Sequence, residues 1–211
     1  MNNISFTKLH KNRISFLKEN SNYDHAILTG RNNILISAPH GVSQVRLGKY
    51  KYSEIGSLTT AIYLHNNCDC FLIAKTQNNN DDANFDTISK YKSSIEKLIK
   101  EKKIKYIIDI HGLSAKRNCD INLGTHLGNN IKNNEELFNR LLYSLQDNGF
   151  TTNIDQPFMA NSNTISSSMS NKFPDIWTLQ IEINCDITNN KAYFEKYKAL
   201  LNILIDWIKS I

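Results

Sequence analysis

The chain has 211 residues and a formal net charge of +5, with 40% hydrophobic and 21% charged residues. A chain of this length buries enough surface to fold as one unit, so we predict a single domain over residues 1–211. The basic residues are scattered rather than gathered into a stripe, which argues against a nucleic-acid-binding protein.

Hydropathy also argues against a membrane protein. No apolar run approaches the ~18–20 residues of a membrane span, and the polar start MNNISFTKLHKNR lacks the apolar region of a signal peptide. We therefore expect a cytoplasmic protein without a membrane partner, whose four cysteines are reduced thiols. The sequence leaves the oligomeric state open.

Strands and helices are expected to alternate along the chain. The short apolar segment Ile14–Leu17 is interpreted as an edge strand, and the first core strand begins at Ile34. The further expected strands are 71–74, 106–110, 120–124 and 178–184, and the expected helices are 54–66, 85–99, 134–148 and 190–211. This alternation predicts an α/β fold, a three-layer α/β/α sandwich around a mixed, largely parallel sheet.

A long polar segment precedes the last expected strand. Residues 155–173 are rich in Ser and Asn and are predicted to form a loop. Loops longer than ~12–15 residues within a compact domain are often functional. We therefore expect this segment to act as a lid over the functional site.

Three of the expected strands carry residues that can bind a metal. The strand that begins at Ile34 breaks at Ala38-Pro39-His40-Gly41, because proline cannot donate to a sheet and glycine accepts unusual backbone angles. His40 therefore lies at the carboxyl end of a strand, where open α/β sheets bind ligands. The run YIIDIHG similarly ends with His111, and TLQIEIN places Glu182 among apolar residues. Two histidines and a carboxylate from separate strands predict a metal site, most simply a zinc site.

Further carboxylates complete this predicted site. Glu54 is the expected third ligand because it begins the helix that follows the His40 loop, and His126 is the alternative to it. Asp109 lies two residues before His111, so strand alternation places both side chains on one face. We assign Asp109 to the catalytic site as a carboxylate that orients the His111 imidazole, with direct ligation of the metal as the alternative.

Each of these residues also has a purely structural interpretation. In that interpretation His40 is a loop histidine, Glu54 is a partner of a helix dipole, and Glu182 is half of a buried ion pair. A general base beside a metal-activated water would account for the burial of Glu182. We therefore prefer the catalytic interpretation of the group as a whole.

Five motifs follow one another along roughly residues 34–184, namely SAPHGVSQVR, KYSEIGS, DDANFD, DIHG and LQIEIN. Together they resemble the N-formylglutamate amidohydrolase family, which is similar in fold and metal site to the zinc carboxypeptidases and aspartoacylases. The resemblance implies a zinc-carboxypeptidase-like fold and a zinc hydrolase that cleaves the amide bond of a small N-acylated amino acid or short peptide. It also implies that His40, Glu54 and His111 bind zinc. Glu182 would then activate water and protonate the leaving amine.

Two departures from the family pattern leave the substrate open. Related carboxypeptidases bind the substrate carboxylate with an Asn-Arg pair, whereas here Asn84 is followed by Phe85. Arg46 or Arg117 is the expected replacement, since a guanidinium group binds a carboxylate through two parallel hydrogen bonds. The chain is also shorter than typical members of the family, which predicts a divergent substrate.

Two other functions remain as alternatives. The first is a catalytically inactive metal- or ligand-binding protein with the same fold. The second is a metal-free serine hydrolase built on Ser166–Ser168, a segment without the glycines of a nucleophile elbow. The predicted ligand types also suit several divalent ions besides zinc.

Overall fold

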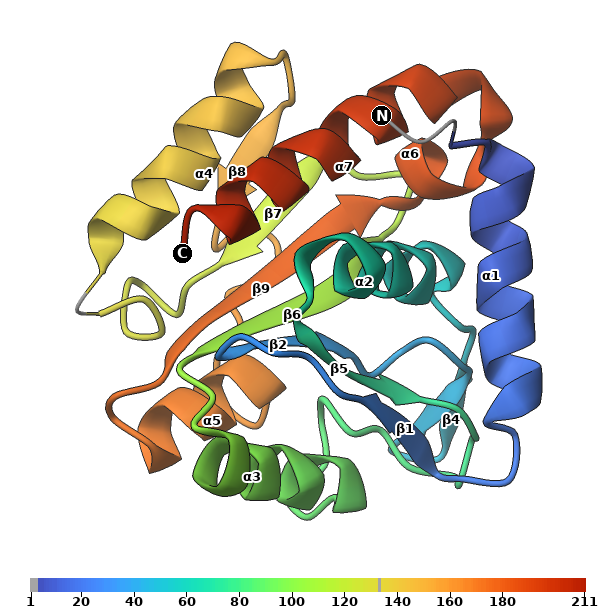
Figure 1. The fold of residues 1–211 in the computed structure, drawn as a ribbon, viewed down its shortest axis with the longest axis vertical. Coiled ribbons are helices and arrows are strands. Elements are labelled where there is room, and N and C mark those ends of the chain that lie inside the picture. The colour runs from blue at the N-terminus through green and yellow to red at the C-terminus, as the bar shows by residue number, and fades with distance from the viewer. Residues whose placement is uncertain (1–3, 133) are drawn as a thin grey trace.

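The computed structural model describes residues 4–132 and 134–211, with a mixed sheet at its centre (Figure 1). The strands of this sheet are β1 His25–Leu28, β2 Ile34–Ala38, β5 Phe71–Lys75, β6 Tyr106–Leu113, β7 Ile121–Gly124, β8 Thr152–Ile154 and β9 Trp177–Asn184. They lie in the order β1-β5-β2-β6-β9-β7-β8. Strands β5, β2, β6 and β9 are parallel, β1 and β7 run antiparallel to their neighbours in this group, and β8 is parallel to β7.

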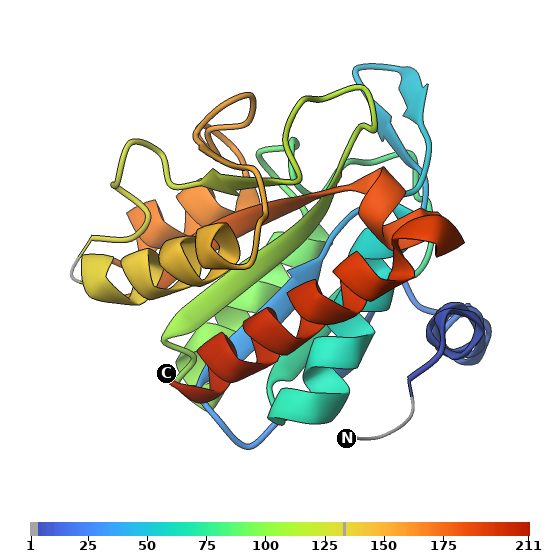
Figure 2. The same ribbon diagram turned by 90° about the horizontal axis from the view of Figure 1, so that it is seen from above.

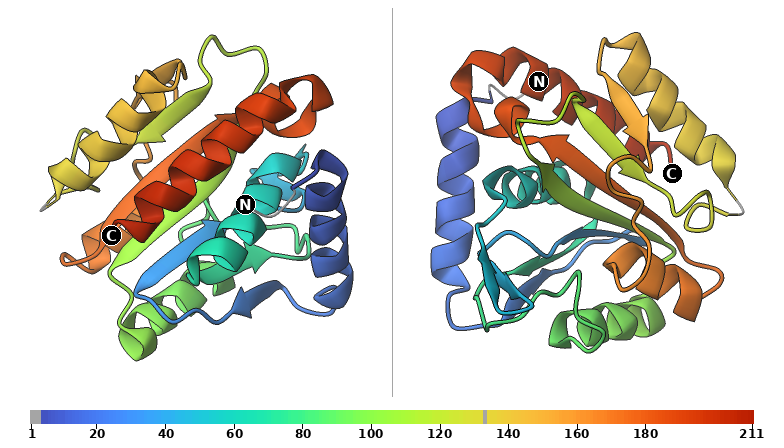
Figure 3. Two further views of the ribbon diagram at one scale, coloured as in Figure 1. Left: turned by 45° about the horizontal axis from the view of Figure 1, so that its top comes forward. Right: turned by 180° about the vertical axis from the view of Figure 1, so that it is seen from behind.

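Helices cover both faces of this sheet (Figures 2 and 3). One side carries α1 Phe6–Glu19, α2 Ile55–Cys68, α4 Glu135–Asp147, α6 Cys185–Asn189 and α7 Phe194–Lys209, with a short 3-10 turn at Lys191–Tyr193. The other side carries α3 Lys90–Lys102 and α5 Ile165–Lys172. A separate hairpin of β3 Gln44–Arg46 and β4 Lys49–Lys51 projects from one end of the sheet.

The strand sequences account for two separate cores. Side chains alternate between the faces of a sheet, so Leu35 and Ile107 pack with α3 and α5, whereas Ile36 and Ile108 pack with α2 and α7. Every residue of β2 is buried, as expected for a central parallel strand covered on both faces. The predicted three-layer α/β/α sandwich around a largely parallel sheet is confirmed. Within residues 4–132 and 134–211, no helix has the length and apolarity needed to cross a membrane.

The first helix corrects one prediction. Ile14–Leu17 is not an edge strand, because it lies inside α1. Ser5 Oγ caps this helix by accepting a hydrogen bond from Lys8 N (3.2 Å). Leu9 and Phe16 are both buried, and their spacing places them on one helix face. A four-residue apolar window is too short to distinguish this helical pattern from a strand.

Polar caps also shift the boundaries of other elements. The segment 155–173 is only partly a loop, because Thr164 caps α5 within it. The predicted helix over 85–99 begins later than expected, because Ser89 caps α3. Strands β1, β3, β4 and β8 are short and partly exposed, and their sequences did not indicate strands.

Candidate active site

The candidate site lies on the sheet face that α3 and α5 cover, at the carboxyl ends of β2, β6 and β9. Toward the amino ends of these strands the face is apolar, with Leu35 and Ile107 in the core. Toward the carboxyl ends it becomes polar, and Asp109, His111 and Glu182 are all buried there. Buried polar groups need partners, so this change in polarity marks a cluster in which such side chains contact one another.

His40 and Glu54 reach this face through a turn and the start of a helix. His40 follows β2 and is buried, and its carbonyl oxygen accepts a hydrogen bond from Glu54 N (2.9 Å). Glu54 immediately precedes α2, but its carboxylate does not cap that helix. Instead, Glu54 Oε2 accepts a hydrogen bond from Gly112 N (2.8 Å). A Cβ atom at position 112 would lie 3.0 Å from Glu54 Cβ, so glycine gives this side chain the room it needs.

His40, Glu54 and His111 converge on one small volume. The two Nδ1 atoms of His40 and His111 lie 3.1 Å apart. Glu54 Oε1 lies 2.8 Å from His40 Nδ1, and Glu54 Oε2 lies 3.4 Å from His111 Nδ1. One ligand atom from each of the three residues lies within 4.8 Å of the others, close enough for a single metal ion to bind all three.

The opposite ring nitrogens each face a carboxylate, which assigns the N–H group of each neutral imidazole to Nε2. His40 Nε2 donates to Asp82 Oδ1 (2.9 Å), and His111 Nε2 donates to Asp109 Oδ2 (3.0 Å). With the N–H group on Nε2, each Nδ1 atom directs a lone pair toward the Glu54 carboxylate and the other ring. Converging acceptors repel one another unless a cation lies among them. Two histidines and a glutamate are also a common ligand set for catalytic zinc, so these residues fit a divalent metal.

The acid–base properties of this cluster agree with a site for positive charge. Burial lowers the pKa of His40, but the Glu54 charge and the hydrogen bonds to Asp82 and Glu54 outweigh burial and raise the pKa to about 9. Burial also lowers the pKa of His111, yet the Asp109 charge and its hydrogen bond bring that pKa well above the usual value. Burial raises the pKa of Glu54, but the two imidazoles hold it well below the usual range.

Glu182 lies in different surroundings from Glu54. It is 5% exposed and is the register partner of His111 on the neighbouring strand, and Gln180 Nε2 donates to its Oε1 atom (2.8 Å). Burial raises the pKa of Glu182 to about 8. The charge of His111 lowers this pKa, whereas the charge of Glu54 raises it further. No lysine or arginine in the described part of the chain forms a salt bridge with it. A buried carboxyl group with a raised pKa beside such a cluster is suited to general acid–base chemistry.

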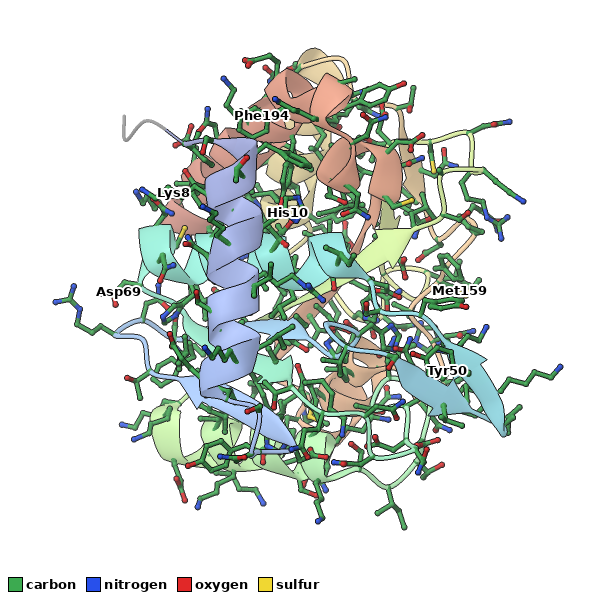
Figure 4. All side chains as sticks on the ribbon, turned by 90° about the vertical axis from the view of Figure 1, so that its right-hand side faces the viewer. Lys8, His10, Tyr50, Asp69, Met159 and Phe194 are labelled. Carbon is green, nitrogen blue, oxygen red and sulfur yellow. The ribbon has the colours of Figure 1, made fainter. Side chains whose placement is uncertain are left out.

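His40, Glu54, His111 and Glu182 lie on the floor of a cavity of about 680 Å³. We call residues 44–52, which include the β3–β4 hairpin, the hairpin rim, and residues 155–164 the loop wall. Figure 2 shows both segments at the same end of the sheet, and Figure 4 labels one residue of each, Tyr50 and Met159. The side chains that line the cavity from outside the floor include Gln44, Arg46, Lys51, Tyr52, Asn84, Phe85, Phe158 and Met159.

The predicted substrate-binding residues occupy different places around this cavity. Arg46 lines it from the hairpin rim, and its Nε atom donates to Asp82 Oδ2 (2.7 Å). Asn84 also lines the cavity, but its Oδ1 atom accepts a hydrogen bond from Ile165 N (2.7 Å). Arg117 is exposed on the segment after β6 and lies outside the cavity lining. Arg46 is therefore the better placed of the two arginines for a ligand in the cavity.

The loop wall is attached along its length. Asp155 accepts hydrogen bonds from three successive backbone N–H groups, those of residues 125–127, and from Thr125 Oγ1. The carbonyl oxygens of Phe158, Met159, Ala160 and Asn163 accept hydrogen bonds from Asn122 Nδ2, His126 N, Asn130 Nδ2 and Lys92 Nζ respectively. This segment is therefore a fixed wall of the cavity rather than the expected lid.

The alternative ligand and the alternative nucleophiles lie away from the cluster. His126 Nδ1 is 3.3 Å from Ser167 Oγ, and His126 is not part of the group of ligand-type residues that His40, Glu54 and His111 form. Ser166 and Ser167 are fully buried in α5. The geometry therefore favours Glu54 over His126 as the third ligand.

Asp82 is a site residue to which the sequence assigned no role, although it lies in the DDANFD motif. It is fully buried, and it joins a residue of the cluster to a residue of the cavity wall, because Oδ1 accepts from His40 and Oδ2 from Arg46. The available signal was the Asp81-Asp82 pair in the polar segment after β5, whose carboxyl end lies beside that of β2. Gln180 was also missed, although it lies two residues before Glu182 on the same strand.

Comparison with solved structures assigns the chain to a fold class. The chain has the fold of zinc-carboxypeptidase-like and N-formylglutamate amidohydrolase-like hydrolases. The resemblance stated from the sequence motifs is thus confirmed at the level of the fold. No family model matches the chain, and no curated protein sequence matches it.

Three solved structures illustrate this similarity of fold. A gene product from Agrobacterium tumefaciens is 13% identical, with a TM-score of 0.66 over 94% of this chain and 97% of that chain. The N-formylglutamate amidohydrolase from Ralstonia eutropha is 10% identical, with a TM-score of 0.61 over 89% of this chain and 98% of that chain. A metallo-carboxypeptidase from Burkholderia cenocepacia is 9% identical, with a TM-score of 0.54 over 95% and 69% of the respective chains. At such identities the similarity establishes a shared fold.

Proposed function

We propose that this chain is a zinc-dependent amidohydrolase that uses activated water to cleave the amide bond of an N-acylated amino acid or short peptide. One observation carries the proposal: two Nδ1 atoms and a carboxylate converge beside the buried Glu182 on the floor of an open cavity. The fold shared with an amidohydrolase and a metallo-carboxypeptidase supports hydrolysis as the reaction class. The choice of zinc rests on the types of ligand present.

His40, Glu54 and His111 are the residues that would hold the ion. A bound divalent cation supplies Lewis acidity, which makes a nearby water more acidic and polarises a carbonyl group. Asp82 and Asp109 accept from the Nε2–H group of each imidazole, which leaves both Nδ1 lone pairs available to hold a divalent cation. Asp109 therefore serves as an orienting carboxylate rather than as a ligand.

Glu182 is the residue that moves the proton. Its carboxylate takes a proton from the attacking water, whose oxygen forms the new bond to the amide carbon. It then delivers this proton to the amide nitrogen while the carbon–nitrogen bond breaks, so the products are a carboxylic acid and a free amine. Burial raises the pKa of Glu182 to about 8, which suits one group to act first as base and then as acid.

Arg46 is the residue that we assign to the substrate carboxylate. Asp82 holds its Nε atom, and its guanidinium group lies 5.1 Å from the centroid of the Phe85 ring. These contacts fix the plane of the guanidinium group and leave its terminal N–H groups to bind a carboxylate. Asn84 lines the cavity beside Phe85 and is the second residue that we assign to substrate binding.

Metal content, measured by elemental analysis on protein purified without a metal-affinity tag, tests the site. We expect about one zinc per chain in the wild type and its loss in His40→Ala and His111→Ala. His126→Ala is the matched control, because this histidine lies outside the cluster and its loss should leave the zinc in place. A wild-type protein that contains no metal and takes up no added zinc would contradict the proposed site.

Turnover of N-formyl, N-acetyl and short-peptide substrates tests the reaction. Glu182→Gln should abolish turnover and retain the zinc, because glutamine cannot take up the proton from water. An active Glu182→Gln enzyme would contradict the role assigned to Glu182. A zinc-loaded wild type that cleaves none of these substrates would instead favour a metal-binding protein that has lost catalysis.

A further inference from the structure

Gln180 is a buried polar residue beside the proposed base. It lies two residues before Glu182 on β9, so strand alternation places both side chains on the same face of the sheet. Both residues line the cavity, with Gln180 2% exposed and Glu182 5% exposed. Gln180 therefore belongs to the floor of the site, although none of the steps described above uses it.

The contact between these two side chains is directional. Gln180 Nε2 donates to Glu182 Oε1 at 2.8 Å. Among the described residues, no other group forms a hydrogen bond with the Glu182 side chain. The orientation of the carboxylate therefore depends on one donor, and Oε2 is left for the cavity that Glu182 lines. A glutamate side chain without such a contact samples several rotamers.

The rest of Gln180 is enclosed by neighbouring strands. Its register partners are Asp109 on β6 and Gly124 on β7. A Cβ atom at position 124 would lie 2.7 Å from Ala160 Cβ, so the loop wall packs directly against the backbone there. Gln180 Oε1 is buried and has no hydrogen-bond partner among the described residues. Buried amide oxygens are usually paired. An amide at this buried position is therefore best explained by the hydrogen bond that its Nε2 atom donates to Glu182.

We propose that Gln180 is a positioning residue for Glu182. Its Nε2–H group holds Oε1, and Oε2 is thereby kept in a fixed orientation toward the attacking water. The inference rests on the proposed function, because it requires Glu182 to act as the base. It deepens that function by assigning the orientation of the base to a second residue on the same strand.

Gln180→Met tests this role, because methionine is close in size to glutamine and cannot donate a hydrogen bond. We expect kcat to fall about tenfold, as when a residue that orients a metal-site group is removed, with KM and zinc content within about a factor of two. Gln180→Asn is the second variant, because it keeps the amide but is too short to reach Glu182, and it should give the same kinetic pattern. Thr178→Val is the matched control, since it removes a buried hydrogen bond (Thr178 Oγ1 to Ser166 O, 3.0 Å) on the same strand and face, outside the cavity.

Substrate binding provides a readout that does not depend on turnover. In zinc-loaded Glu182→Gln protein, adding Gln180→Met should leave the calorimetric Kd for the substrate unchanged, because Gln180 acts on the base and not on the substrate. A normal kcat in both Gln180 variants, or a Kd weakened as much as kcat, would overturn the positioning role. An active Glu182→Gln enzyme would overturn the proposed function instead, so the two failures are distinguishable.

Discussion

The two sides of the cavity are held in opposite ways. The loop wall contains no helix or strand, yet its carbonyl groups and Asp155 are bound by side chains and backbone groups of the neighbouring elements. The hairpin rim is regular β-structure, but all three residues of β4 are exposed, and Leu47 and Tyr52 are 80% and 85% exposed. Its contacts with the rest of the protein lie at its base, where Val45 N donates to Asp81 O (3.1 Å).

This difference shows that regular secondary structure and rigidity are separate properties. A segment is stable when opening it exposes buried apolar groups or breaks buried hydrogen bonds, whether or not it is helical or extended. By that criterion the loop wall belongs to the stable part of the molecule, and the tip of the hairpin rim is the segment around the cavity that opens most easily. The following predictions test this contrast.

Asp155→Ala should have the largest effect. Asp155 is buried and accepts four hydrogen bonds, three of them from successive backbone N–H groups. Without it, Thr125 N and Leu127 N would lose their partner, whereas His126 N would keep Met159 O. We expect a loss of about 3 kcal/mol in the free energy of unfolding, measured with denaturant. Asp175→Ala is the control, because Asp175 is exposed, and it should change stability by less than about 0.5 kcal/mol. Equal effects of the two substitutions would contradict a fixed loop wall.

Lys92→Met should loosen the other end of the loop wall. Lys92 is 4% exposed, and its ammonium group donates to Asp86 O (2.6 Å) and to Asn163 O. Removing this donor leaves two carbonyl groups unpaired and should cost about 2 kcal/mol. Amide hydrogen exchange should become faster at Thr164, whose N–H group donates to Asn161 O, and Lys90→Met, which changes an exposed lysine, should leave it unaltered. Unchanged exchange in the Lys92 variant would show that this contact does not hold the wall.

The base of the hairpin rim should respond to pH through Asp24. Lys75 Nζ donates both to Asp24 and to Asp81 Oδ2 (2.8 Å), and Asp81 in turn binds Val45. Burial raises the pKa of Asp24, but the hydrogen bonds from His25 and Lys75 outweigh burial and lower the pKa from 3.8 to about 2. Because this pKa is lowered by folding, Asp24 stabilises the fold fully at pH values above its pKa in the unfolded chain. It loses this contribution as the pH falls toward 2.

Asp24→Asn measures that contribution directly. The wild type should be more stable than the variant by about 1 kcal/mol near neutral pH, and the gap should close between about pH 4 and pH 2. Unfolding curves of both proteins across this range provide the test. A gap that stays constant down to pH 2 would show that the ionised Asp24 does not stabilise the folded protein.

Leu47→Ser should have the smallest effect. Leu47 is 80% exposed at the tip of the hairpin rim, so its loss should change the free energy of unfolding by less than about 0.5 kcal/mol. In the wild type, amides of residues 47–50 should exchange faster than those of Asp155 and Thr164, whose N–H groups donate to Leu123 O and Asn161 O. Slower exchange in the tip than in the loop wall would reverse the contrast between the two sides of the cavity.

The strand-borne half of the site was predictable from the sequence. His40 follows the break at Pro39, and His111 and Glu182 lie in apolar runs, so local pattern alone assigns each to the end of a strand. Parallel neighbours bring such ends to one edge of a sheet, and alternation decides which face a side chain takes. These rules suffice for the three-layer fold and for the grouping of the two histidines with Glu182.

The partners of those residues were decided by the tertiary structure. Asp82 lies 42 positions from His40 in a polar segment whose composition indicates a loop and nothing more, and Lys92 lies 71 positions from Asn163. The physical reason is that the periodicity of neighbouring residues encodes a strand or a helix. A hydrogen bond between distant segments depends on how the packed sheet and helices place their ends. The same reason explains why residues 155–164 look like a mobile loop in the sequence and form a fixed wall in the folded protein.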